Sequence, residues 1–158
     1  MQNQYIERRA SENKYLHKDF HCSMDQGLAY LGMKYGDDAV NEYLGKFARL
    51  FYAPLIKNAG ERGLPEIRKH ISETYAAEEV PENVVFHEIE NELKVTITAC
   101  PAVLHMRAVG YEPSKWYIKT TSIINKAIAC EAGFGFEMLS YDEKTGAAEY
   151  RFFKEAQL

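Results

Sequence analysis

The sequence is poor in paired cysteines, long apolar runs and excess basic charge, and each absence excludes a class of protein. Its three cysteines have scattered spacing and do not make a disulfide framework. No apolar stretch approaches membrane-spanning length, and the first residues are too polar for a signal peptide. The formal net charge is -4 without a basic run, which argues against nucleic-acid binding. We therefore expect a cytoplasmic protein with reduced thiols that binds neither nucleic acid nor a membrane.

Motifs of common cofactor and nucleophile sites are missing as well. The sequence has no Gly-rich phosphate loop, no G-x-S-x-G and no dinucleotide fingerprint. The GFGF run at 133–136 is typical of a helix stop followed by a strand. The sequence therefore predicts no cofactor.

The composition is that of one globular domain. Of the 158 residues, 46% are hydrophobic and 13% aromatic, which suffices for a core without covalent staples. Residues 1–13 are polar and are predicted to form a flexible lead-in, leaving 14–158 as a single domain. Eleven tyrosines and eight phenylalanines could line a ligand pocket, although an aromatic core has the same composition.

The first half of the domain shows helical periodicity. Apolar residues recur at three- and four-residue spacing and predict helices over 14–35, 38–60 and 65–77. Pro54 lies late in the second of these and should kink or end it.

The second half alternates between apolar and polar residues, as strands do. This pattern predicts strands over 84–89, 93–100, 134–141 and 147–154, with a helix over 113–132. Strands joined by short turns are antiparallel, and helices must cover one face of their sheet. The predicted fold is therefore α+β, with helices packed on an antiparallel β-sheet.

Cys100 is the first candidate catalytic residue. It ends a predicted strand, and by alternation its side chain points with Thr96 and Thr98. Because Pro101 follows, its backbone is held extended and its thiol direction is fixed, as a nucleophile requires. His105 could act as its base, and Arg107 could lower its pKa or hold a substrate carboxylate, so we expect a thiolate near neutral pH. The alternative is a small buried hydrophobic residue at a corner of the core.

A second candidate group lies on the first predicted helix. His17 and His21 are four residues apart and share one side of the helix, with His17 within the apolar stripe and His21 on its rim. We expect His21 to face the same cavity as Cys100. Asp25 follows one turn later and could orient the His21 ring. The alternative is two histidines at the edge of the core, satisfied by hydrogen bonds.

The same residues include zinc-ligand types. His17, His21, Cys100 and His105 would be suitable donors, but neither a C-x-x-C pair nor an H-E-x-x-H run is present. The sequence therefore predicts no metal site.

Two runs carry a family resemblance. HKDFHCSMDQGLAYLGMKYGDDAV, followed by ACPAVLHM, a helix, a glycine and a closing hairpin, resembles the L-2-amino-thiazoline-4-carboxylic acid hydrolase-like family. The order of elements also resembles the ligand-binding fold of four-vinyl-reductase domains, haem-NO-binding domains and vesicle-tethering subunits. The resemblance spans most of residues 14–154 and implies a small molecule held between helices and an antiparallel sheet.

The family name implies a hydrolase that opens a cyclic amidine ring to an N-carbamoyl cysteine. Such chemistry needs a nucleophile, a proton donor and a cation for the carboxylate. Cys100 would be the nucleophile, and His21 or His105 the acid and base. Arg107 or Lys119 would hold the carboxylate, with His17 and Asp25 completing the predicted substrate site.

Two other functions remain open. A non-catalytic small-molecule-binding domain, such as a sensor, would have an apolar pocket with Cys100 buried and unpartnered. A protein-interaction subunit would show a broad exposed apolar patch. In each case we expect a homodimer, because two hairpins leave edge strands that need cover.

Overall fold

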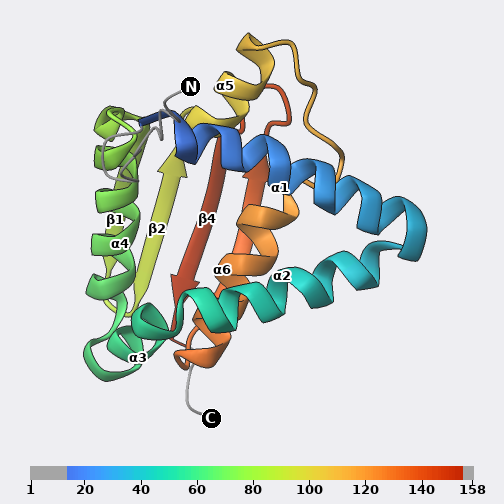
Figure 1. The fold of residues 1–158 in the computed structure, drawn as a ribbon. Helices are drawn as coiled ribbons and strands as arrows, with labels where there is room; N and C mark the ends of the chain where they lie inside the picture. Colours follow the sequence, from blue (N-terminus) through green and yellow to red (C-terminus); the bar gives the residue numbers. More distant parts are fainter. Residues whose placement is uncertain (1–13, 155–158) are drawn as a thin grey trace, which may run out of the picture.

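A four-stranded antiparallel sheet carries its helices on one face (Figure 1). The computed structural model describes the backbone of residues 14–154 and side chains from Phe20 onward, so the predicted lead-in at 1–13 lies outside the described residues. The elements, in chain order, are α1 (Lys14–Tyr35), α2 (Asp37–Phe51), α3 (Ala53–Arg62), α4 (Leu64–Ala77), the 3₁₀ turn η2 (Pro81–Asn83), β1 (Val84–Ile89), β2 (Glu92–Ile97), α5 (Pro101–Ala108), α6 (Lys119–Glu131), β3 (Gly135–Tyr141) and β4 (Ala148–Phe153). The predicted α+β fold class is confirmed.

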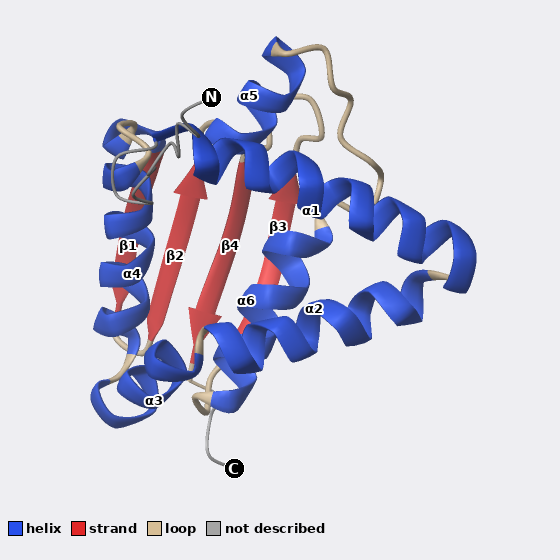
Figure 2. Cartoon of the chain, viewed as in Figure 1, coloured by secondary structure: helices blue, strands red, loops and turns tan. Residues whose placement is uncertain are grey.

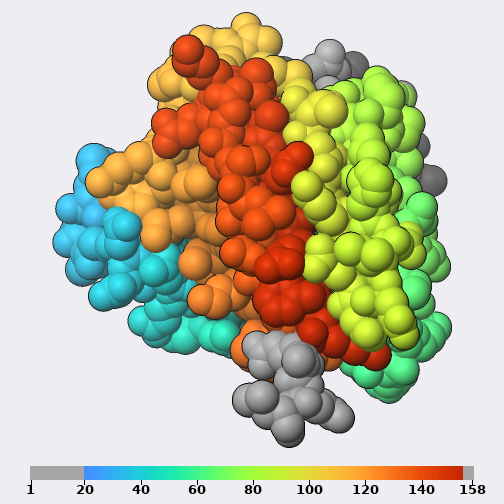
Figure 3. Space-filling view, turned by 180° about the vertical axis from the view of Figure 1, so that it is seen from behind, coloured from blue at the N-terminus to red at the C-terminus, as the bar shows by residue number. Residues whose placement is uncertain are grey.

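The two central strands explain why the helices gather on one side. The strand order is β1-β2-β4-β3, and in β2 and β4 every second residue is buried. The buried partners Val95 and Tyr150 face each other across the two strands, and Ile97 pairs with Ala148. The helices cover this face (Figure 2), whereas the strands themselves form the surface seen from behind (Figure 3). Because each central strand has one apolar face, these faces together form a core beneath the helices.

Pro54 breaks the second predicted helix in two. The chain leaves the helical path at Tyr52, where α2 has ended, and resumes as α3 with Pro54 at its start. Proline has no amide hydrogen and its ring collides with the carbonyl four residues earlier, so a continuous helix is disfavoured. The predicted end at Pro54 is thus confirmed, while the single range 38–60 is corrected to two helices.

The prediction is wrong around Cys100. The strand predicted over 93–100 ends at Ile97, and Pro101 begins an unpredicted helix, α5. Proline suits the first helical position because its missing amide hydrogen would be unpaired there anyway. Since the strand stops early, the alternation does not reach Cys100, which lines a cavity together with Ile97 rather than pointing away from it.

The helix predicted over 113–132 also starts later than expected. Residues 111–118 form a loop and turns, and α6 begins at Lys119. Cys130, near the end of α6, is exposed.

A second core forms where α1 and α2 meet α6. Its buried residues include Leu28, Leu44 and Trp116. The Trp116 indole packs directly against Gly32 of α1, so closely that any Cβ there would collide with the ring. The indole Nε1 donates to Oδ1 of Asp37 at 2.8 Å, which fixes the start of α2. A glycine is therefore required at position 32 by contact, not by backbone conformation.

Two glycines of α1 give a matched test of this contact. Gly32→Ala should lower the free energy of unfolding by about 1–3 kcal/mol, because the new methyl group must displace the Trp116 ring. Gly27→Ala, in the same helix with open space around it, should raise it by about 1 kcal/mol, because alanine is the better helix former. Urea unfolding followed by circular dichroism measures both, and equal effects of the two variants would refute the close packing.

Candidate functional site

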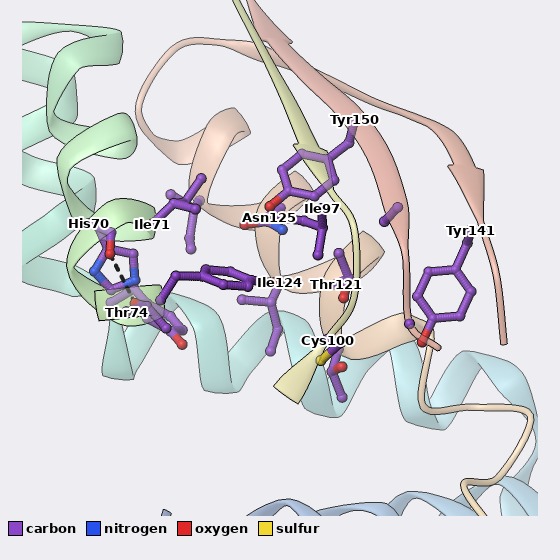
Figure 4. Close-up of a pocket in the computed structure, with 16 residues that line it drawn as sticks. His70, Ile71, Thr74, Ile97, Cys100, Thr121, Ile124, Asn125, Tyr141 and Tyr150 are labelled. Carbon is purple, nitrogen blue, oxygen red and sulfur yellow. Dashed lines mark hydrogen bonds between the residues drawn. The ribbon is translucent and has the colours of Figure 1, made fainter. Parts of the chain in front are cut away.

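A cavity of about 170 Å³ lies between the helix-covered face of the sheet, α4 and α6 (Figure 4). Its apolar walls include Ile71 from α4, Ile97 from β2, and Ile124 and Ile128 from α6. Its polar lining consists of Tyr52, His70, Thr74, Tyr75, Cys100, Thr120, Thr121, Asn125, Tyr141 and Tyr150. The predicted nucleophile thus lies at a cavity of mixed polarity.

Cys100 is held in place by backbone on both sides. Its N–H donates to the carbonyl of Thr145 at 2.9 Å, and its own carbonyl accepts from the N–H of Leu104 within α5. Gly146 presses against it so closely that a Cβ would collide with the Cys100 Cβ, and its φ of 68° also favours glycine. The thiol position is therefore fixed by the start of α5 and by the turn between β3 and β4.

The ionisation of Cys100 runs against the prediction. Burial raises the pKa of the thiol, and the backbone N–H groups of Val103 and Ala102 oppose this only in part. The thiol is therefore protonated near neutral pH, and the expected thiolate is not supported.

Three tyrosines bring unpartnered hydroxyls to this cavity. Burial is the largest cause that raises the pKa of Tyr75, Tyr141 and Tyr150, so these phenols keep their protons. Their hydroxyls make no hydrogen bond to any residue that the structure describes, and neither do the side chains of Thr121 and Asn125. Among the described residues, Nε of Arg107 is the only side-chain polar atom that is both inaccessible to solvent and without a hydrogen-bond partner. The unpartnered groups of the tyrosines, Thr121 and Asn125 are therefore accessible from the cavity.

His70 is a cavity residue that the sequence analysis did not identify. It is half-buried on α4 with its ring edge-on to Tyr52, the centroids 5.4 Å apart. Burial lowers its pKa, with Glu73 acting weakly in the other direction, so its imidazole is neutral near neutral pH. The sequence feature that could have identified His70 is its position beside Ile67 and Ile71, on the inner face of the predicted helix.

The predicted histidine partners of Cys100 do not line this cavity. Nδ1 of His21 lies 3.1 Å from the hydroxyl of Tyr117, and the two rings meet edge to face. His105 is half-buried on α5. His17 lies on α1 at a position whose side chain is outside the described residues.

Asp25, predicted to bind substrate or orient His21, is fully buried and holds the loop after α5. Its Oδ2 accepts from the Tyr111 hydroxyl at 2.8 Å and from the Ser114 N–H at 2.7 Å. Its Oδ1 accepts from the Ser114 hydroxyl at 2.7 Å. These contacts join α1 to residues 111–114 and give the carboxylate a structural role.

The two predicted carboxylate-binding cations are engaged elsewhere. Arg107 donates to Oε2 of Glu112 at 2.6 Å and to the carbonyl of Glu143 at 3.1 Å, beside a separate cavity of about 100 Å³. Lys119 donates to Oδ1 of Asn41 at 2.8 Å and lies 3.4 Å from Oδ2 of Asp37. Neither of these cations lines the Cys100 cavity.

Comparisons with known proteins and the arrangement of the described residues give four further findings. No protein-family model matches the chain, and no curated protein matches it. From residue 14 to 154, no three His, Cys, Asp or Glu side chains are grouped so that they could hold a metal ion. Within the same span, every helix is too short or too polar to cross a membrane.

The role of Asp25 can be tested by removing its charge. Asp25→Asn should lower the free energy of unfolding by about 1–3 kcal/mol, because an amide cannot accept all the bonds donated by Tyr111 and Ser114. Asp38→Asn, an exposed change on α2, should have little effect. Chemical denaturation measures both, and an Asp25→Asn protein of unchanged stability would contradict the structural role.

Proposed function

We propose that the protein is a small-molecule-binding domain whose ligand occupies the cavity at Cys100. The observation that carries the proposal is the cavity lining, in which the hydroxyls of Tyr75, Tyr141 and Tyr150 have no described protein partner. Ligand sites combine apolar walls with a few convergent polar groups, and this cavity has that composition. No histidine of the described residues hydrogen-bonds to the protonated Cys100 thiol, which supports binding over catalysis.

Hydrolysis of a cyclic amidine is the second candidate function, and one arrangement favours it. The Cys100 thiol lies at the start of α5, where the N–H groups of Ala102 and Val103 favour its charged form. His70 lines the same cavity as a neutral imidazole and could accept a proton through the substrate. Against it stand the raised thiol pKa and a described cavity lining without lysine or arginine to hold a carboxylate.

Alkylation by iodoacetamide tests both candidates, with Cys130 as an internal control. Cys130 is exposed, whereas burial raises the pKa of Cys100, so Cys130 should be labelled much faster near neutral pH. Saturating phenol, a single neutral ring, should slow the labelling of Cys100 and leave Cys130 unchanged. Peptide mass spectrometry follows the three cysteines separately.

The possible outcomes separate the candidates. Labelling of Cys100 ahead of Cys130 would indicate an activated thiol and favour the hydrolase. In that case Cys100→Ala should abolish ring opening while the fold is kept, since a lost sulfur leaves only a small cavity. Labelling of Cys100 that phenol does not slow would contradict a binding cavity.

We also propose that the chain is a cytoplasmic homodimer. The described cysteines form no disulfide bond, which fits a reducing compartment. Strands β1 and β3 are the sheet edges, and Leu50 and Phe51 on α2 are large exposed apolar residues that a partner could cover. Light scattering should return about twice the 18.1 kDa chain mass, and a monomer at working concentrations would contradict the proposal.

A further inference from the structure

We propose that the ligand is a neutral molecule with a single ring and a hydrogen-bond acceptor directed at the tyrosine hydroxyls of the cavity. The inference rests on the proposed function and adds the chemical class of the ligand. It follows from the size of the cavity, the donors on its walls and the absence of charged side chains from its described lining.

The size of the cavity suits a ligand of about one ring. Its volume is about 170 Å³. An engineered apolar cavity of about 150 Å³ in another protein holds one benzene molecule. A six-membered ring with one small substituent therefore fits within it.

Apolar walls favour a ring over an extended polar molecule. Ile71, Ile97 and Ile124 present their side chains around the cavity from α4, β2 and α6, respectively (Figure 4). Removing apolar surface from water contributes about 25 cal/mol per Å², so a ring against these side chains gains most of its binding energy by contact.

Each unpartnered polar group of the cavity can donate a hydrogen bond, and each can also accept one. Tyr75, Tyr141 and Tyr150 are protonated phenols, and Thr121 and Asn125 add a hydroxyl and an amide. Each of these groups lacks a hydrogen bond to the described residues, so a bound molecule can satisfy it without breaking one within the protein. A ligand with a carbonyl oxygen or ring nitrogen is the complement of such a lining.

The surroundings disfavour a charged ligand. No lysine, arginine, aspartate or glutamate is found among the described residues that line the cavity. His70 is its basic group, and burial keeps that imidazole neutral. An ion moved from water into such a site loses hydration that no charged side chain of the described lining replaces, which costs several kcal/mol.

Four probes of one ring and similar size test the ligand class: benzene, benzamide, benzoate and benzamidinium. Isothermal titration of each into the full chain should give the tightest binding for benzamide, about tenfold tighter than benzene. This ratio corresponds to about 1.4 kcal/mol from added hydrogen bonds. Benzoate and benzamidinium should bind at least about tenfold more weakly than benzamide, because each carries an unpaired charge.

A matched pair of tyrosine variants tests the donors. Tyr150→Phe keeps the ring and removes a cavity hydroxyl that has no described protein partner, so the fold should be kept. It should reduce the advantage of benzamide over benzene and leave benzene binding unchanged. Tyr43→Phe, on the exposed side of α2, should change neither.

Each outcome bears on one proposal. Equal binding of benzamide and benzene, or an unaltered ratio in Tyr150→Phe, would show that the hydroxyls are not used and would overturn the ligand class. Tightest binding of benzoate or benzamidinium would overturn the class as well but leave a binding cavity. Failure of all four probes to bind would overturn the proposed function itself.

Discussion

The buried carboxylate of Asp25 is the contact on which the helical half of the molecule depends. A carboxylate without exposure is costly unless donors surround it, and here the donors are the Tyr111 hydroxyl and the N–H and hydroxyl of Ser114. The loop after α5 is therefore bound to α1 at one point. Trp116 and Tyr117 follow that point immediately, and each returns to an N-terminal helix, Trp116 at Gly32 and Tyr117 at His21.

The cavity depends on this contact indirectly. Once the loop is anchored, α6 begins at Lys119, which binds Asn41 and Asp37 of α2. The start of α6 then determines how Thr121 and Asn125 face the sheet. Two residues predicted to touch substrate, Asp25 and Lys119, thus position the wall of the cavity rather than line it.

The sequence predicted the secondary structure that local periodicity encodes, but not the roles of residues whose contacts are distant in the chain. Alternation located all four strands, and the position before Pro101 indicated Cys100, which does line the cavity although β2 ends at Ile97. The partners of Asp25 are 86 and 89 residues away, so no window of sequence could reveal its role. His70 was missed although it adjoins Ile71 on the inner face of its helix, because other residues of the cavity come from β4 and α6, far away in the sequence. Pro101 also led to a wrong prediction of the strand end, because a proline can follow the end of a strand or occupy the first position of a helix.

Because Cys100 is buried, the charge of the ligand decides between the two candidate functions. The uncharged surroundings that favour a neutral ring also raise the pKa of Cys100, so a neutral ligand would meet an unreactive thiol. A cationic amidine would act in the opposite direction, because its charge beside the sulfur lowers the thiol pKa and stabilises the thiolate. Hydrolysis at Cys100 therefore requires a substrate that supplies the positive charge missing from the described cavity lining. Binding without reaction requires a ligand that carries no positive charge.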